Sequence, residues 1–140
     1  MVLSYRTVSN EERRQAQRRD HLMEKKLDNS DLPAAVHGFV DGWQGRDADK
    51  VEGLFAADAV VTDEGHTHRG RDEINGWVEN SINLFSTTLT FLGAREVDGM
   101  VGASYRLEGD FPGGVVGLEY QFHLDESGQI VKLDFASAAA

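Results

Sequence analysis

The stretch that decides the fold runs from Phe55 to Ile74 and reads FAADAVVTDEGHTHRGRDEI. It begins with a short apolar run that ends in the carboxylate of Asp63, after which Gly65 turns the chain. A brief return leads to Gly70 and to a predicted helix with acidic residues in its first turn, where the helix dipole favours them. A strand that ends in a carboxylate can hold this acid at the mouth of a cavity, where a desolvated acid can serve as a proton-transfer base.

Two further helices are predicted upstream of this stretch. The first follows Pro33, which suits the first turn of a helix, and Gly45 ends it. Its apolar residues recur at i, i+3, i+4 and i+7 and so form one face: Val36, Phe39, Val40 and Trp43. Asp47 can cap the second, shorter helix. The helix after Gly70 has its own buried stripe, which comprises Ile74, Trp77, Val78, Ile82 and Phe85.

The chain from Thr87 onward shows an apolar period of two, which predicts β-strands. Asp98-Gly99 is a hairpin signal, and turns are also expected at 111–114 and 125–128. An antiparallel meander of four strands is therefore predicted, over 87–97, 100–108, 115–124 and 129–136.

This order of elements indicates the α+β class. We predict a curved antiparallel sheet packed against three helices, which together form a cone with an internal pocket. Residues 31–140 are taken as this domain and residues 1–30 as an N-terminal helical arm. A capping-box pattern, Ser9-x-x-Glu12, begins the arm's helix, which is expected to run from about Asn10 to Leu27.

Composition excludes several classes of function. The net charge is −10, with +2 on residues 1–30 and −12 on residues 31–140, so the body should repel nucleic acid and anionic membranes. The absence of cysteine excludes disulfides and thiolate metal sites. No apolar run reaches membrane-spanning length, and the first ten residues lack a secretory pattern, so a cytoplasmic protein is expected.

The runs 55–63 and 69–74 resemble the nuclear transport factor 2-like superfamily, and more narrowly they are similar to the SnoaL-like polyketide cyclases and ketosteroid isomerases. The segment 122–130 is similar to the penultimate strand, turn and last strand of that group. The resemblance covers about residues 32–136 and implies the cone fold. It does not imply one activity, since this superfamily hosts isomerases, cyclases, dehydratases, epoxide hydrolases and plain binding domains.

The resemblance also implies site residues. Asp63 stands where ketosteroid isomerases keep their proton-shuttling aspartate, and Tyr120 stands where a protonated aspartate donates to the developing enolate. Phe39 stands where they keep the oxyanion-binding tyrosine, and it lacks the hydroxyl. The predicted function is a cofactor-independent isomerase or cyclase for a small apolar or polyketide-like molecule. Its pocket is expected to be lined by Phe39, Trp43, Val61, Trp77, Leu118 and Phe122.

Other interpretations stay open. Asp63 could merely cap the turn at Gly65, and Tyr120 could be a core tyrosine with a backbone partner. The missing hydroxyl at Phe39 and the unusual arm suit a non-catalytic ligand-binding or assembly module. Members of the resembled group commonly form homodimers through the open sheet face, and here that face would carry Ser104, Gln121 and His123.

Two other chemistries are disfavoured by the pattern. His66 and His68 form an H-x-H beside Asp63, but no further clear ligand set accompanies them, so a metal site is not predicted. Arg106 and Glu108 partly mimic the Asp-Arg-Asp set of limonene-type epoxide hydrolases. The last acid of that set is replaced by Phe135, and alternation places Asp134 on the opposite face.

Overall fold

The computed structural model of the protein describes residues 9–11, 14 and 24–140. Its elements in chain order are β1 (Glu24–Leu27), the short 3-10 helix η1 (Asn29–Asp31), α2 (Ala34–Gln44), α3 (Ala48–Glu52), β2 (Phe55–Asp63), β3 (His66–Arg69), α4 (Gly70–Ile82), β4 (Thr87–Val97), β5 (Met100–Gly109), β6 (Val115–Leu124) and β7 (Ile130–Ser137). Within this described part, none of the helices combines the length and the apolar character that a membrane span requires.

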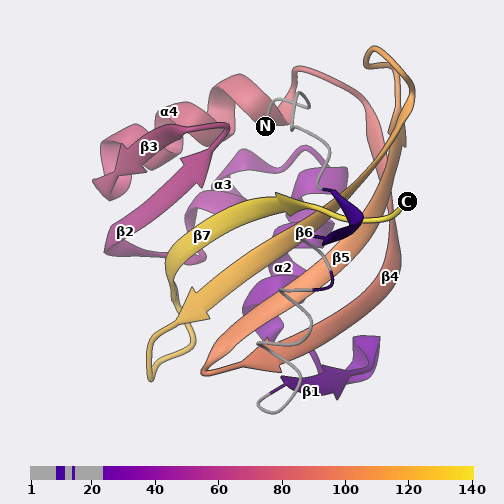
Figure 1. Ribbon diagram of the computed structural model, residues 1–140. Helices are drawn as coiled ribbons and strands as arrows, with labels where there is room; N and C mark the ends of the chain where they lie inside the picture. The colour runs from indigo at the N-terminus through magenta and orange to yellow at the C-terminus, as the bar shows by residue number, and fades with distance from the viewer. Residues whose placement is uncertain (1–8, 12–13, 15–23) are drawn as a thin grey trace.

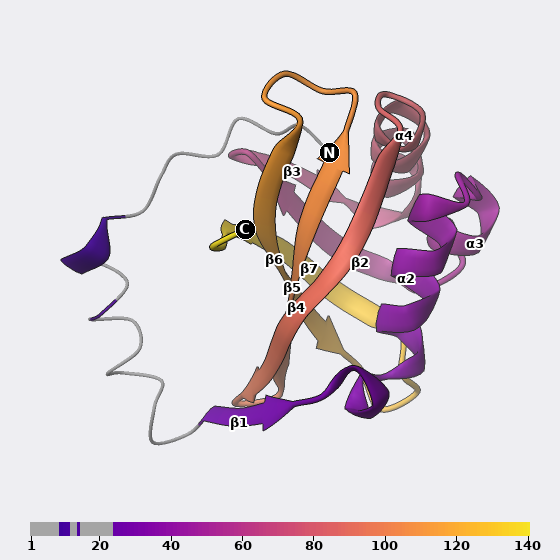
Figure 2. The same cartoon turned by 90° about the vertical axis from the view of Figure 1, so that its right-hand side faces the viewer.

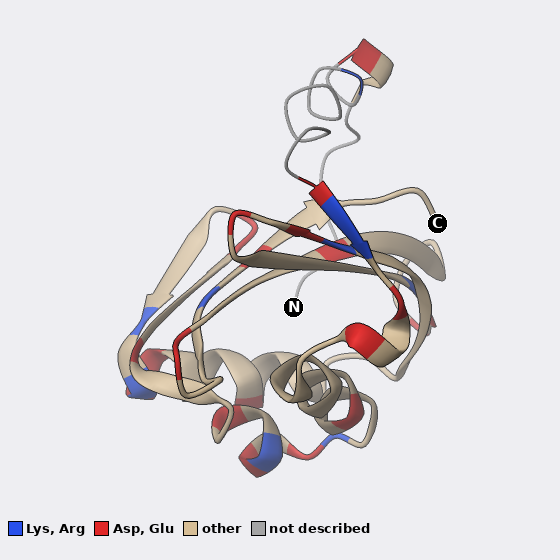
Figure 3. Ribbon diagram, turned by 90° about the horizontal axis from the view of Figure 1, so that it is seen from below, with Lys and Arg blue, Asp and Glu red and all other residues tan. Residues whose placement is uncertain are grey.

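The seven strands form one sheet with the order β1-β4-β5-β6-β7-β2-β3. Neighbouring strands are antiparallel except β2 and β7, which run parallel. The sheet curves strongly, and α2, α3 and α4 gather on its concave side (Figures 1 and 2). Seen from below, the sheet arches over the helices (Figure 3). The predicted α+β cone with three helices is confirmed.

The helices follow the predicted signals closely. Helix α2 begins directly after Pro33 and ends at Gly45, and it buries the predicted apolar face. The Asp47 side chain caps α3 by accepting a 3.2 Å hydrogen bond from the Lys50 backbone N–H. The two helices approach closely at Gly42, where an added Cβ would lie only 2.8 Å from Val51 Cγ2. The absence of a side chain at this position therefore allows α2 and α3 to pack against each other.

Strand alternation places one face of β5 and β6 in the core. On β6 the inward residues Leu118, Tyr120 and Phe122 are fully buried, as predicted. Strand β4 departs from strict alternation, because its pairing with β5 is irregular between Phe91 and Gly93. Such a bulge shifts the facing of the residues that follow it, so Ala94 packs on the core in place of Gly93.

The prediction that the arm's helix extends to Leu27 is wrong. Residues 24–27 form β1, an edge strand whose register pairs Glu24 with Val97 and Leu27 with Ala94. The edge of the long strand β4 offers unpaired backbone groups, so residues 24–27 pair with it, and Leu27 also packs on the core. Asn10, Glu11 and Arg14 are helical, and the remainder of the predicted helix lies outside the described residues.

Candidate active site

Asp63 is the one buried charged side chain among the described residues, with 4% exposure. It is the last residue of β2, where Ala59, Val61 and Asp63 alternate inward along the strand. The chain then turns through Glu64 and Gly65, both with positive φ. The strand pattern that buries two apolar side chains therefore carries the carboxylate into the core with them.

Trp77 holds the carboxylate in place. Its indole Nε1 donates a buried 3.1 Å hydrogen bond to Asp63 Oδ2. Gly70, with φ +80, allows the chain to leave β3 and begin α4, which packs against β2. The helix thus brings Trp77 to the end of the strand, and a neutral donor satisfies part of the buried carboxylate.

Tyr120 is fully buried on the inner face of β6. Its ring centroid lies 5.1 Å from Phe135, 5.5 Å from Tyr105 and 5.7 Å from Phe39. The pKa of the Tyr120 phenol is raised above its ordinary value, mainly because the side chain is buried. The neighbouring Tyr105 and the charge of Asp63 raise this pKa further, in that order of size. The phenol therefore stays protonated at neutral pH, as a hydrogen-bond donor must.

The six residues predicted to line the pocket all belong to the buried core around this pair. Phe39 stacks on Trp43 with centroids 5.3 Å apart and meets Phe122 edge-on at 5.5 Å. Trp43 lies 5.5 Å from Trp77. The remaining two, Val61 and Leu118, are completely buried. The residues are thus brought together as predicted, and their role toward a ligand stays a prediction.

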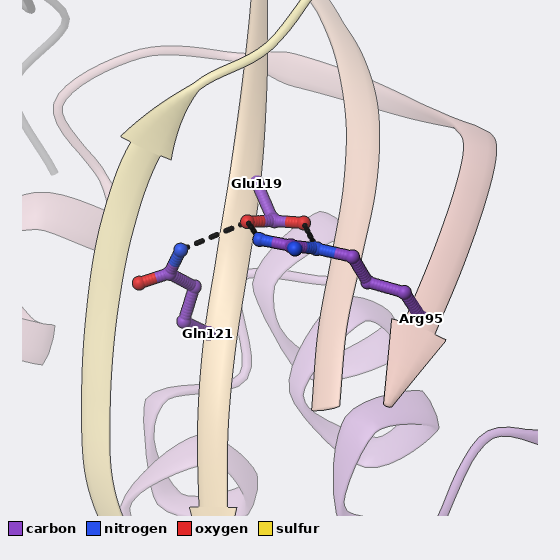
Figure 4. A network of polar contacts seen from close by, with 3 residues as sticks. All are labelled: Arg95, Glu119 and Gln121. Carbon is purple, nitrogen blue, oxygen red and sulfur yellow. Dashed lines mark hydrogen bonds and ion pairs between the residues drawn. The ribbon is translucent and has the colours of Figure 1, made fainter. Parts of the chain in front are cut away.

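A groove of about 410 Å³ lies on the other side of the sheet. Its lining comes from β1 and the adjoining Asp28 and from β4, β5 and β6: Glu24, Lys26, Leu27, Asp28, Leu92, Gly93, Ala94, Arg95, Ser104 and Glu119. Beside it, Arg95 and Glu119 form a two-pronged ion pair of 2.8 and 3.0 Å, and Gln121 donates to the same carboxylate (Figure 4). The groove differs from the predicted pocket inside the cone. Sequence reasoning missed it because one wall is β1, which was predicted to be helical.

The histidines beside Asp63 lie on the edge strand β3. His66 is exposed, while His68 is half-buried with its ring 6.1 Å from Trp77. No group of three potential metal ligands occurs among the described residues. The two histidines therefore border the site without forming a ligand cluster in this part of the chain.

The residues that partly mimic an epoxide hydrolase face away from the core. Arg106 and Glu108 form a 2.6 Å ion pair at the surface. Asp134 pairs with Lys132 at 3.6 Å, whereas Phe135 points inward, with its ring 5.1 Å from that of Tyr120. The structure thus keeps these acids and the arginine on the side of the sheet opposite Asp63.

Tyr105 is a polar residue of the core that sequence reasoning passed over. It lies on the inner face of β5 with 3% exposure, and its ring packs 5.8 Å from Phe91. Alternation along β5 places this side chain on the same face as Ala103 and Leu107. The sequence does mark this residue, because Tyr105 is the one residue with a hydroxyl group on the apolar face of β5.

Comparisons with known proteins agree with this architecture. The sequence profile of the SnoaL-like domain matches residues 36–132. A proposed polyketide cyclase from Sinorhizobium meliloti is 30% identical, and the alignment covers 79% of this chain and 100% of that one, with a TM-score of 0.71. No curated protein matches the sequence.

Two more distant structures share the fold alone. A Δ5-3-ketosteroid isomerase from Mycobacterium sp. is 21% identical, and the alignment covers 75% of this chain and 91% of the isomerase chain, with a TM-score of 0.64. A Mycobacterium tuberculosis protein in complex with estradiol-17beta-hemisuccinate is 16% identical over 74% of this chain and 91% of its own, with a TM-score of 0.62.

Proposed function

Because the chain belongs to the SnoaL-like domain family, we propose that it is a small-molecule isomerase or cyclase that abstracts a proton next to a carbonyl group. Asp63 is the base and Tyr120 is a donor to the developing enolate oxygen. The observation that carries this proposal is a buried carboxylate that accepts from Trp77 and interacts electrostatically with a buried phenol. Fold relatives include an isomerase and a proposed cyclase, which supports the same reaction class.

The proposed steps conserve charge within the site. The Asp63 carboxylate takes a proton from the carbon next to the carbonyl, and the electron pair of the broken C–H bond moves to form the enolate. The carboxylate becomes a neutral acid as the enolate acquires the negative charge. In isomerisation the acid returns the proton to another carbon. In cyclisation the enolate carbon attacks a second carbonyl, and the new alkoxide takes the proton.

Tyr120 is proposed to stabilise the enolate that forms when the proton is abstracted. A phenol that stays protonated can donate to an enolate oxygen without losing its proton. The charge of Asp63 is one cause of the raised Tyr120 pKa, and this effect disappears once Asp63 is protonated. The donor is therefore expected to be strongest when the enolate is present.

The proposed ligand is a planar or polycyclic ketone of apolar character. The surroundings of Asp63 and Tyr120 favour it, because the inward residues are aromatic or aliphatic. The estradiol derivative in the complex of the Mycobacterium tuberculosis protein is likewise polycyclic and largely apolar, although it carries a phenol in place of a ketone. Such a ligand would contact the rings of Phe39, Trp43 and Trp77.

The test is proton exchange, because it does not require the final product to be known. A panel of polycyclic and aryl ketones is incubated with the protein in deuterated water, and loss of the α-proton signal is followed by NMR. Asp63→Asn is expected to slow exchange by about 10²-fold or more. Asp58→Asn, an exposed carboxylate on the same strand, is the matched control and should exchange like wild type. Full exchange by Asp63→Asn would refute the mechanism.

A second candidate is a ligand-binding module without chemistry. The observation that favours it is the complete burial of Tyr120 among aromatic rings. Phe39 also supplies no hydroxyl at the position where the resembled isomerases have one. This alternative predicts saturable binding of the same ketones, with α-proton exchange no faster than in buffer for wild type and for Asp63→Asn.

A further inference from the structure

Tyr105 and Tyr120 form a pair of phenols on neighbouring strands. In the register of β5 and β6, Tyr105 lies opposite Leu118 and Tyr120 lies opposite Ala103, so the two tyrosines are diagonal neighbours on one face. Their ring centroids are 5.5 Å apart, with the planes inclined by 45°. The inner surface of the sheet thus carries two hydroxyl-bearing rings side by side.

The described part of the chain does not use the hydroxyl of Tyr105 in a hydrogen bond. The side chain is 3% exposed, yet none of the described residues is a hydrogen-bond partner of its oxygen. Every fully enclosed polar side-chain atom in this part of the chain has a partner, so the Tyr105 oxygen lies at the edge of the core. A nearly buried hydroxyl without a partner carries a desolvation cost, which phenylalanine at this position would avoid.

The charge of Asp41, an exposed residue of α2, acts on Tyr105. Burial and then the charge of Asp41 raise the pKa of the Tyr105 phenol to about 12. Tyr105 is in turn one cause of the raised pKa of Tyr120, and Asp63 is another. Four titratable groups therefore interact in series from the exposed helix to the buried end of β2: Asp41, Tyr105, Tyr120 and Asp63.

We propose that Tyr105 is a second hydrogen-bond donor of the site, which receives the carbonyl oxygen of an uncharged planar ketone together with Tyr120. This proposal rests on the proposed function and deepens it. It supplies the hydroxyl that Phe39 lacks, from the sheet instead of from α2. The oxygen of Tyr105 lies at the edge of the core while Tyr120 is completely buried, so a ligand that enters from this edge meets Tyr105 first.

The proposed pair also indicates what the site rejects. An anionic ligand beside Tyr120 would lie near the buried carboxylate of Asp63, which would repel it. A neutral ketone meets no such repulsion, and two protonated phenols can donate to the two lone pairs of its oxygen. The expected ligand class is therefore an uncharged carbonyl compound or phenol.

The test uses 2-naphthol, whose hydroxyl oxygen can accept from both tyrosines, and naphthalene, which has the same rings without that oxygen. Dissociation constants are measured by fluorescence titration for wild type, Tyr105→Phe, Tyr120→Phe and Asp63→Asn. Tyr105→Phe is expected to weaken 2-naphthol binding about 5-fold and to leave naphthalene binding unchanged. Its thermal unfolding midpoint should not fall, because the hydroxyl makes no hydrogen bond to the described residues.

The outcomes separate this inference from the proposed function. If 2-naphthol binds and responds to Tyr120→Phe and Asp63→Asn but not to Tyr105→Phe, the second donor is refuted and the proposed site stands. If wild type binds neither probe, both proposals fail. A lowered unfolding midpoint in Tyr105→Phe, with equal loss of both probes, would assign the hydroxyl a structural role and overturn the inference.

Discussion

The indole Nε1 of Trp77 and the carboxylate of Asp63 are joined by a 3.1 Å hydrogen bond between residues 14 positions apart in the chain. The bond connects the third turn of α4 to the last residue of β2. It therefore links the helix layer to the sheet at the candidate catalytic carboxylate. The orientation of this carboxylate depends on how α4 packs.

This bond predicts a specific loss of stability in Trp77→Phe. Removing a donor from a buried carboxylate should lower the free energy of unfolding by about 1.5–3 kcal/mol beyond the loss of ring volume. Trp43→Phe is the matched control, since Trp43 is equally buried and its ring lies 5.5 Å from that of Trp77. Urea unfolding of both variants gives the difference. If the difference persists unchanged in an Asp63→Ala background, which lacks the acceptor, the hydrogen bond is not its source.

The raised pKa of Tyr105 predicts a loss of stability at alkaline pH. The phenol titrates near 10.0 in the unfolded chain and near 12 in the folded protein. Between these values the folded state binds more protons, so stability falls as pH rises, by at most about 1.4 kcal/mol per pH unit. Urea unfolding from pH 9 to 12 should show a shallower decline for Tyr105→Phe. Parallel curves for the two proteins would contradict the raised pKa.

Gly102 is predicted to be intolerant of alanine. The Glu119 side chain crosses β5 to reach Arg95 on β4 (Figure 4), and a Cβ at Gly102 would lie 2.6 Å from Glu119 Oε2. This carboxylate is held by Arg95 and Gln121, so Gly102→Ala should cost about 1–3 kcal/mol in unfolding free energy. Gly93→Ala, with nothing within 4 Å of the added Cβ, is the control. Equal stability of the two variants would show that Glu119 moves freely.

A homodimer through the outer face of the sheet remains a prediction from the family resemblance. Sedimentation at micromolar concentration should give a dimer. Ser104→Arg, near the centre of this face, should shift the protein to monomer, since two-fold symmetry would place two added charges in one interface. Thr67→Arg on the exposed edge strand β3 is the control and should leave the dimer intact. Monomer alone in wild type would reject the prediction.

Local pattern was sufficient for most of the fold. The observed bounds of β4 and β6 equal the predicted ones, because a period of two between clear turn signals leaves little freedom in where a strand begins and ends. The burial of Asp63 follows from the same alternation. The cap at Asp47 and the end of α2 at Gly45 likewise depend on neighbours within one helical turn.

Contacts between distant segments were beyond such reasoning. The helical prediction failed at 24–27, where pairing with β4 outweighs a weak local preference. The bulge after Phe91 also arises from pairing with β5, and no period in the sequence marks it. Trp77 was predicted to line a pocket, but its bond to Asp63 depends on the packing of α4.

The sequence by itself determined the α+β class, the strand and helix order, and the buried apolar face of α2, since each follows from spacing along the chain. Only the tertiary structure decided that Trp77 donates to Asp63, that the two tyrosines are diagonal neighbours, and that Glu119 crosses Gly102 to reach Arg95. These relationships join elements far apart in the chain. Their geometry is set by strand register and helix packing, which depend on the balance of many contacts at once.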